Sequence, residues 1–154
     1  MAKFNYRMQS VLDIKSQLEE QARMEFALAR NRLDEEEAKL ATLKERREHY
    51  ETQGRSLRSD RLHIQDIMDN RTAIERMKEY MLSQQARVTK AQNLLEQARA
   101  AMQTAMQERK TQEKLRERAF EDFVQEINAA EAKEVDELTS YTYGQRRGEE
   151  ENAE

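Results

Sequence analysis

Several residue types that disulfide-linked or catalytic folds need are absent or scarce. The sequence has no cysteine and no proline, and it contains three glycines. Without cysteine there can be no disulfide framework and no thiolate metal site. The lack of thiols fits a reducing compartment, so we expect the cytoplasm. The few glycines exclude a phosphate-cradling loop such as Gly-x-x-x-x-Gly-Lys, and we expect no cofactor to bind.

Histidine is scarce too, and its two copies are isolated. No second histidine or cysteine accompanies His49 or His63, and a pair such as His63 with Asp66 supplies at most two of the ligands that a metal needs. The carboxylates at 34–37 lie on an expected exposed helix, without the desolvated pocket that shifts a pKa. We therefore expect no metal site, no catalytic residues and no enzyme activity.

Long apolar runs and a charge excess are also missing. No uncharged apolar stretch approaches the roughly 20 residues that cross a bilayer. The net charge is -4 and both signs are interleaved, so no basic face is large enough to hold a phosphate backbone. We expect no nucleic acid partner, and membrane association only through protein partners.

What the sequence does contain is helix-forming residues in a regular apolar pattern. Charged residues make up 38% and hydrophobic residues 37% of the chain, and Glu, Gln, Arg, Ala and Leu are abundant. Apolar residues recur at steps of three and four, as in a coiled coil. In the first half they are Phe4, Met8, Val11, Leu18, Ala22, Phe26, Ala29, Leu33, Leu40, Leu43 and Tyr50. The pattern predicts a helix over about 4–53, with a stutter at Leu18, Ala22 and Phe26.

The apolar pattern lapses around Gly54, where polar residues crowd together. We expect the turn there, because glycine is a helix breaker and the chain has no proline. Ser59 or Asp60 could cap a new helix, and Asp69-Asn70 offers a second capping point. The connection, about 54–69, is therefore expected to contain a short helix.

The pattern resumes after the connection and predicts a second, longer helix over about 70–143. Its seam comprises Ile74, Met77, Met81, Val88, Ala91, Leu95, Ala98, Met102, Arg109, Leu115, Ala119, Phe123, Ile127 and Leu138. Gly144 and Gly148 interrupt the pattern, and glutamates follow them. We expect 144–154 to be a disordered acidic tail.

Two sequential helices with a short connection pack as antiparallel neighbours. The predicted fold is all-α: residues 1–143 form a long antiparallel two-helix coiled coil, a helical hairpin. Folding about a point near residue 62 places Phe4 opposite Phe120 and leaves about 20 residues of the second helix unpaired. An unpaired apolar stripe such as Phe123–Leu138 marks a partner surface, unless this end frays or dimerises.

Segments in both halves of the chain occur in an order and spacing typical of one family. They are Phe4-x-Tyr6 with Val11-Leu12-x-Ile14-Lys15, Tyr80-Met81-Leu82 with Gln84-Gln85, Glu108-Arg-Lys110-x-x-Glu-Lys-Leu-Arg-Glu-Arg118, and Glu131-x-Lys133-Glu-x-Asp136-Glu137-Leu138. Together they resemble the bacterial flagellar FliJ family, from Phe4 to about Tyr141. The resemblance implies a non-enzymatic, central-stalk-like coiled coil of the flagellar type III export apparatus.

The resemblance also implies partners and a location. The partners are the hexameric flagellar export ATPase, the cytoplasmic domain of the export-gate membrane protein, and flagellar export chaperones. The location is cytoplasmic, peripheral at the cytoplasmic face of the inner membrane. The alternative function is a generic cytoplasmic coiled-coil spacer or scaffold that homodimerises through the overhanging end of the second helix.

The family's gate-binding surface is an apolar patch across the middle of both helices. By resemblance it falls here on Leu43, Tyr50, Met77 and Tyr80. Arg46, Ala73 and Gln84 stand where the family has more apolar or aromatic residues. Leu43, Tyr50 and Met77 could instead belong to the seam alone, whereas Tyr80 lies off it.

For the ATPase ring, the stalk analogy indicates the end that bears both chain termini. The implied residues are Phe4, Tyr6, Val11, Leu12 and Lys15, with Lys114, Arg116 and Arg118 opposite them. The three basic residues could instead form ion pairs along the helix surface with Glu113, Glu117 and Glu121.

Overall fold

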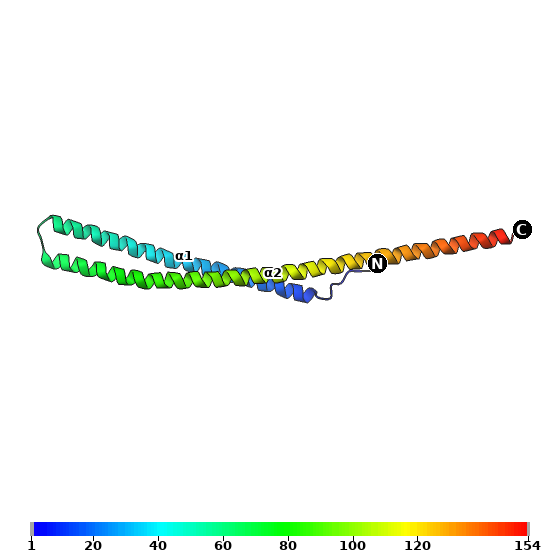
Figure 1. Ribbon diagram of the computed structural model, residues 1–154, viewed down its shortest axis with the longest axis horizontal. Helices are drawn as coiled ribbons and strands as arrows, with labels where there is room; N and C mark the ends of the chain where they lie inside the picture. Colours follow the sequence, from blue (N-terminus) through cyan, green and yellow to red (C-terminus); the bar gives the residue numbers. More distant parts are fainter. Residues whose placement is uncertain (1, 154) are drawn as a thin grey trace. The chain divides into compact units, whose positions relative to one another are not determined.

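The computed structural model describes residues 2–153, and these form two α-helices without any strand. Helix α1 is Gln9–Ser59 and helix α2 is Ile64–Glu151 (Figure 1). The all-α prediction is confirmed. The chain forms two compact units to which both helices contribute. The described residues of unit 1 are 2–16 and 107–153, and unit 2 is Gln17–Met106.

In unit 2, the seam of α1 follows a strict seven-residue repeat. One series is Glu19, Phe26, Leu33, Leu40, Arg47 and Gly54, and the other is Ala22, Ala29, Glu36, Leu43, Tyr50 and Leu57. The predicted stutter is wrong. Glu19 is 4% exposed and occupies the seam, while Leu18 is 45% exposed. An uninterrupted repeat keeps one stripe facing the partner helix, and Arg23 offsets the buried charge through a 2.8 Å ion pair to Glu19.

Helix α2 supplies the complementary seam of unit 2. Its inward-facing residues are Asn70, Ile74, Met77, Met81, Gln84, Val88, Ala91, Leu95, Ala98 and Met102. The apolar positions predicted from Ile74 to Met102 are confirmed, and Asn70 and Gln84 complete the repeat. Glu36 bonds to Gln84, while Tyr50, further along α1, bonds to Asn70, which comes earlier in α2. The two helices of this unit are therefore antiparallel, as predicted.

The turn does not lie at Gly54, so that prediction is wrong. Gly54 is buried inside α1, and none of the described glycines has a positive φ. Helix α1 continues to Ser59, and the connection is 60–63. The hydroxyl of Ser59 donates back to Ser56 O (2.9 Å), and Asp60 Oδ1 accepts from the N–H of Arg61 (2.8 Å). Both hydrogen bonds lie at the end of α1 and in the turn. Neither side chain therefore caps a short helix, so that prediction is wrong.

Position 54 has no room for a side chain, because Asn70 approaches it closely. A Cβ at Gly54 would lie 2.5 Å from Asn70 Oδ1. The amide of Asn70 donates to the backbone carbonyl of Tyr50 (2.8 Å), so the side chain crosses the seam. The capping role expected for Asp69-Asn70 is wrong, and so is the separate short helix over 54–69, because α2 begins at Ile64 and passes through both residues.

In unit 1, an aromatic cluster joins the residues before α1 to α2. The ring centroid of Phe4 lies 5.2 Å from that of Phe120 in an edge-to-face arrangement and 5.4 Å from that of Phe123. The predicted pairing of Phe4 with Phe120 is confirmed. Helix α1 begins at Gln9 rather than near residue 4, and the N–H of Gln9 bonds to Tyr6 O (3.2 Å).

The end of α2 also differs from the prediction. The helix passes through Gly144 and Gly148 to Glu151, so the expected disordered tail is helical up to that residue. Residue 154 lies outside the described part. No proline stops the helix, and helix-forming Glu, Gln and Arg surround the two glycines. Every described side chain from residue 128 onward is exposed, and the predicted seam residue Leu115 is 45% exposed.

Candidate partner-binding surfaces

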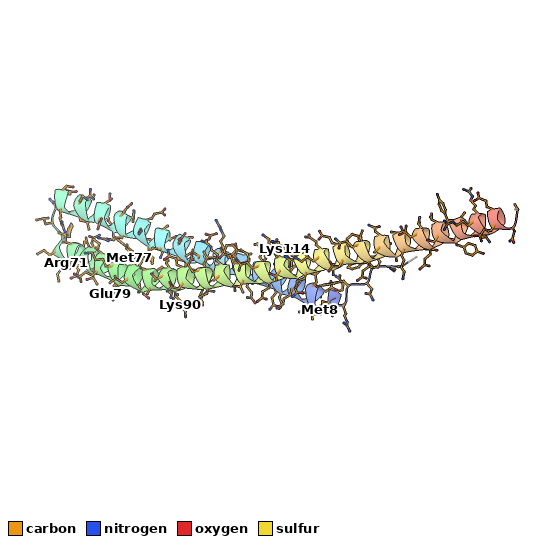
Figure 2. All side chains as sticks on the ribbon, turned by 45° about the vertical axis from the view of Figure 1, so that its right-hand side comes forward. Met8, Arg71, Met77, Glu79, Lys90 and Lys114 are labelled. Carbon is orange, nitrogen blue, oxygen red and sulfur yellow. The ribbon has the colours of Figure 1, made fainter. Side chains whose placement is uncertain are left out.

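The four residues assigned to gate binding occupy two different environments. Leu43, Tyr50 and Met77 are half-buried seam residues between α1 and α2, with Met77 labelled in Figure 2. Tyr80 lies off the seam and is 53% exposed. The structure thus places three of them at packed seam positions. It leaves Tyr80 as the side chain most available to a partner.

Among the residues that depart from the family's apolar pattern, Gln84 has a structural role. It is 7% exposed, and its amide donates to the backbone carbonyl of Glu36 (3.0 Å) and to the Glu36 carboxylate. Arg46 is exposed and Ala73 is half-buried. Because Gln84 is committed to the seam, it locks α2 against α1 instead of offering a contact surface.

Glu36 is 3% exposed, and its carboxylate remains charged because a hydrogen bond and two ion pairs compensate for its burial. The hydrogen bond from Gln84 is the main cause that holds the pKa of Glu36 below its ordinary value, against the effect of desolvation. Lys39 and Arg32 add to this, with nitrogens 3.4 and 3.5 Å from Glu36 Oε1. A buried charge of this kind needs such partners.

These polar seam residues were missed when only apolar positions were followed. Glu19, Glu36, Asn70 and Gln84 all fall at the steps of three and four that the apolar residues define. Extending the repeat strictly through polar positions would have identified them. The signal is weak in a sequence rich in Glu and Gln, because most such residues lie on solvated faces.

The residues assigned to the ATPase ring divide into packing and exposed groups. Leu12 is 7% exposed, and Lys15 Nζ forms a 2.9 Å ion pair with Glu108 Oε2, so both hold the start of α1 on α2. Tyr6 and Val11 are half-buried. Phe4 and Leu12 line a groove together with Glu113, Arg116, Glu117 and Phe120. Arg116 is thus the one implied basic residue that shares a groove with the aromatic cluster.

The three implied basic residues of α2 are all exposed. Among the described residues, no ion pair joins Lys114, Arg116 or Arg118 to a carboxylate within 4.0 Å, whereas Glu113 pairs with Arg109 at 2.6 Å. The alternative in which these cations pair with Glu113, Glu117 and Glu121 along the helix surface is therefore not observed. Their charges face solvent.

Beyond residue 127, α2 carries apolar side chains without any cover in unit 1. These are Val135, Leu138, Tyr141 and Tyr143, which are 60–71% exposed. Large apolar side chains rarely stay exposed in succession on a monomer's surface unless they meet a partner. Within residues 2–153, no helix is apolar enough over sufficient length to cross a membrane, and no group of His, Asp and Glu could hold a metal ion.

These features define a two-helix coiled-coil protein with exposed apolar and basic side chains on α2. The family model described as Flagellar FliJ protein matches residues 4–148. The chain therefore belongs to the FliJ family, a non-enzymatic component of the flagellar protein export apparatus. Comparisons with curated proteins and with solved structures found no match.

Proposed function

We propose that the chain is a central-stalk-like component that binds the hexameric flagellar export ATPase and the cytoplasmic domain of the export-gate membrane protein, and helps to escort export chaperones. The observation that carries this proposal is the family match over 4–148. Through these partners the chain would be held at the cytoplasmic face of the inner membrane. Two packed helices can transmit force or orientation between bound partners.

The proposed ATPase-binding surface lies in unit 1. It combines the exposed cations Lys114, Arg116 and Arg118 with the uncovered apolar side chains at 135–143. Phe4, Leu12 and Lys15 support it by fixing the start of α1 against α2. An exposed helix that carries both apolar and unpaired basic side chains suits insertion among several surrounding subunits.

The proposed gate-binding surface lies in unit 2 and centres on Tyr80. Tyrosine at a half-exposed position offers a large apolar ring and a hydroxyl, which is why it is common in interfaces. Leu43, Tyr50 and Met77 lie in the seam, and their partly exposed atoms could extend the contact. Methionine in such a position can repack against different partners.

The proposal is tested by adding the purified chain to its cognate export ATPase and following ATP hydrolysis. We expect the rate to rise as the chain is added, and the Leu138→Glu variant to stimulate less, because a charge replaces an exposed apolar side chain. The matched control is Leu28→Glu, which changes a comparably exposed leucine of α1 in unit 2. An unchanged rate with the wild-type chain would count against ATPase binding.

A structural scaffold is the second candidate, because the exposed Val135 and Leu138 could equally pack against a second copy of the chain. In that case the stripe from Phe123 to Leu138 would bury itself against the same stripe of a second copy. Sedimentation equilibrium separates the two functions. A tight dimer that Leu138→Glu dissociates supports the scaffold, and a monomer supports the export component.

A further inference from the structure

One edge of unit 2 gathers basic residues from both helices. Arg32, Arg87 and Lys90 line a single groove with Leu94, on the side of the seam where Glu36 lies. Figure 2 labels Lys90 on α2. We call Arg32, Arg87, Lys90 and Leu94 the basic groove.

The seven-residue repeat extends the basic groove into two stripes. On α1, Arg32, Lys39 and Arg46 follow one another every seven residues and so share one side of the helix. On α2, Tyr80, Arg87 and Leu94 do the same. Tyr80, the candidate gate-binding residue, therefore lies on the same side of α2 as Arg87 and Leu94 of the basic groove. Arg46, which replaces an apolar residue of the family pattern, lies on the facing stripe.

The free positive charge of the basic groove comes from α2, because Arg32 on α1 already pairs with Glu36 at 3.5 Å. Glu36 is the one carboxylate among its described lining residues, and it is 3% exposed and already bonded to Gln84. Within residues 2–153, Arg87 and Lys90 have no carboxylate within 4.0 Å. Leu94 adds an apolar side chain that is 47% exposed. A ligand that matches the groove needs negative charge and an apolar contact together.

We propose that the basic groove binds an acidic segment of the export-gate cytoplasmic domain, with an apolar side chain of that segment against Leu94. The inference rests on the proposed function, since it extends the surface around Tyr80. Carboxylates of the segment pair with Arg87 and Lys90 from α2, the two groove cations that have no carboxylate partner within residues 2–153. Pairs of this kind mainly determine the association rate and the specificity of an interface.

A protein segment fits the groove better than a nucleic acid does. Phosphate backbones are held by long rows of cations, and here a few basic residues surround an apolar side chain on a chain of net charge -4. The acidic run 149–151 of a second copy has suitable charge but lies in a segment without a large apolar residue.

The opposite edge of unit 2 provides a stringent control. Its groove also contains cations, Lys44 and Lys78, together with Leu82. Arg47 lines it too but is paired with Glu51 at 3.1 Å. Heptad geometry places Lys44 and Lys78 on the side of the seam away from Tyr80 and Leu94. Reversing charges there changes the net charge equally without touching the basic groove.

The experiment titrates the purified cytoplasmic domain of the cognate export-gate protein with the full chain at low and moderate ionic strength. We expect the Arg87→Glu, Lys90→Glu double variant to raise Kd by about tenfold or more and to flatten the salt dependence. We expect the Lys44→Glu, Lys78→Glu control to bind within about twofold of wild type, because its charges lie outside the contact. Circular dichroism verifies that both variants fold.

The remaining outcomes of the titration would each contradict one claim about the groove or its partner. Equal Kd for wild type and the Arg87, Lys90 variant refutes the basic groove while leaving gate binding intact. An equal loss in both double variants shows that only net charge matters, which also refutes the groove. No binding by the wild-type chain refutes the proposed gate partner and this inference with it. Two outcomes with gate binding unchanged would assign the groove to another occupant: self-association that the Arg87, Lys90 variant loses, or binding of single-stranded nucleic acid that this variant loses.

Discussion

Helix α2 carries similar apolar side chains in two environments, one with a partner helix and one without. In unit 2, Leu95 meets α1 and is 9% exposed, whereas Leu138 in unit 1 is 61% exposed. A coiled-coil pattern therefore specifies a stripe, and the presence of a facing helix decides whether that stripe is buried. In the uncovered stretch, the apolar side chains of α2 are left exposed to solvent.

Replacing the two leucines by alanine should separate these environments most strongly. Leu95→Ala removes buried atoms from a packed seam, so we expect the free energy of unfolding to fall by about 2–3 kcal/mol. Leu138→Ala removes exposed atoms and should change it by less than about 0.5 kcal/mol. Urea denaturation followed by circular dichroism measures both. Equal losses would mean that Leu138 is packed within the isolated chain.

The contact between Gly54 and Asn70 should show a strong coupling. Gly54→Ala alone gains about 1 kcal/mol of helix propensity. It also displaces the Asn70 amide from Tyr50 O, so we expect a net loss of about 1 kcal/mol. In the Asn70→Ala background the clash is gone, and the same change should stabilise by up to about 1 kcal/mol. Additive effects in a double-mutant cycle would show that the two residues do not touch.

The charged seam residue Glu36 should give a smaller effect that depends on pH. Its pKa is depressed in the native state, so the unfolded state binds more protons in acid and stability rises with pH. The contribution is complete above the unfolded-state pKa of Glu36 and is lost as pH falls through its native pKa. We expect the Tm of wild type to drop more in acid than that of Glu36→Gln. Parallel Tm curves from neutral pH to pH 3 would rule out this linkage.

Much of the fold follows from the sequence because helix propensity and apolar spacing agree. Both long helices, their antiparallel pairing in unit 2 and the pairing of Phe4 with Phe120 were all predictable. The turn was not, because Gly54 indicates a helix break in sequence terms. In the structure its lack of a side chain makes room for Asn70, and such a close approach depends on a residue from the other helix.

The candidate surfaces were less predictable than the helices. Tyr80 was assigned as exposed and is exposed. The buried Gln84 and Glu36 depend on each other, and neither residue type signals burial by itself. The basic groove was hidden because its cations come from two helices, Arg32 from α1 and Arg87 and Lys90 from α2, and lie far apart in the sequence. Only the strict repeat, which fixes the register of α1 against α2, reveals which side chains share an edge.

The central claim is this register within a single chain, and disulfide trapping tests it most directly because the sequence has no cysteine. The Gly54→Cys, Asn70→Cys variant should oxidise readily to a product of one chain's mass, since a Cβ at position 54 would lie 3.3 Å from the Cγ of Asn70 across the seam. The Gly54→Cys, Gln84→Cys control moves the second cysteine two repeats along α2 and should stay largely reduced. Equal oxidation of both variants, or products of two chains' mass, would contradict the account.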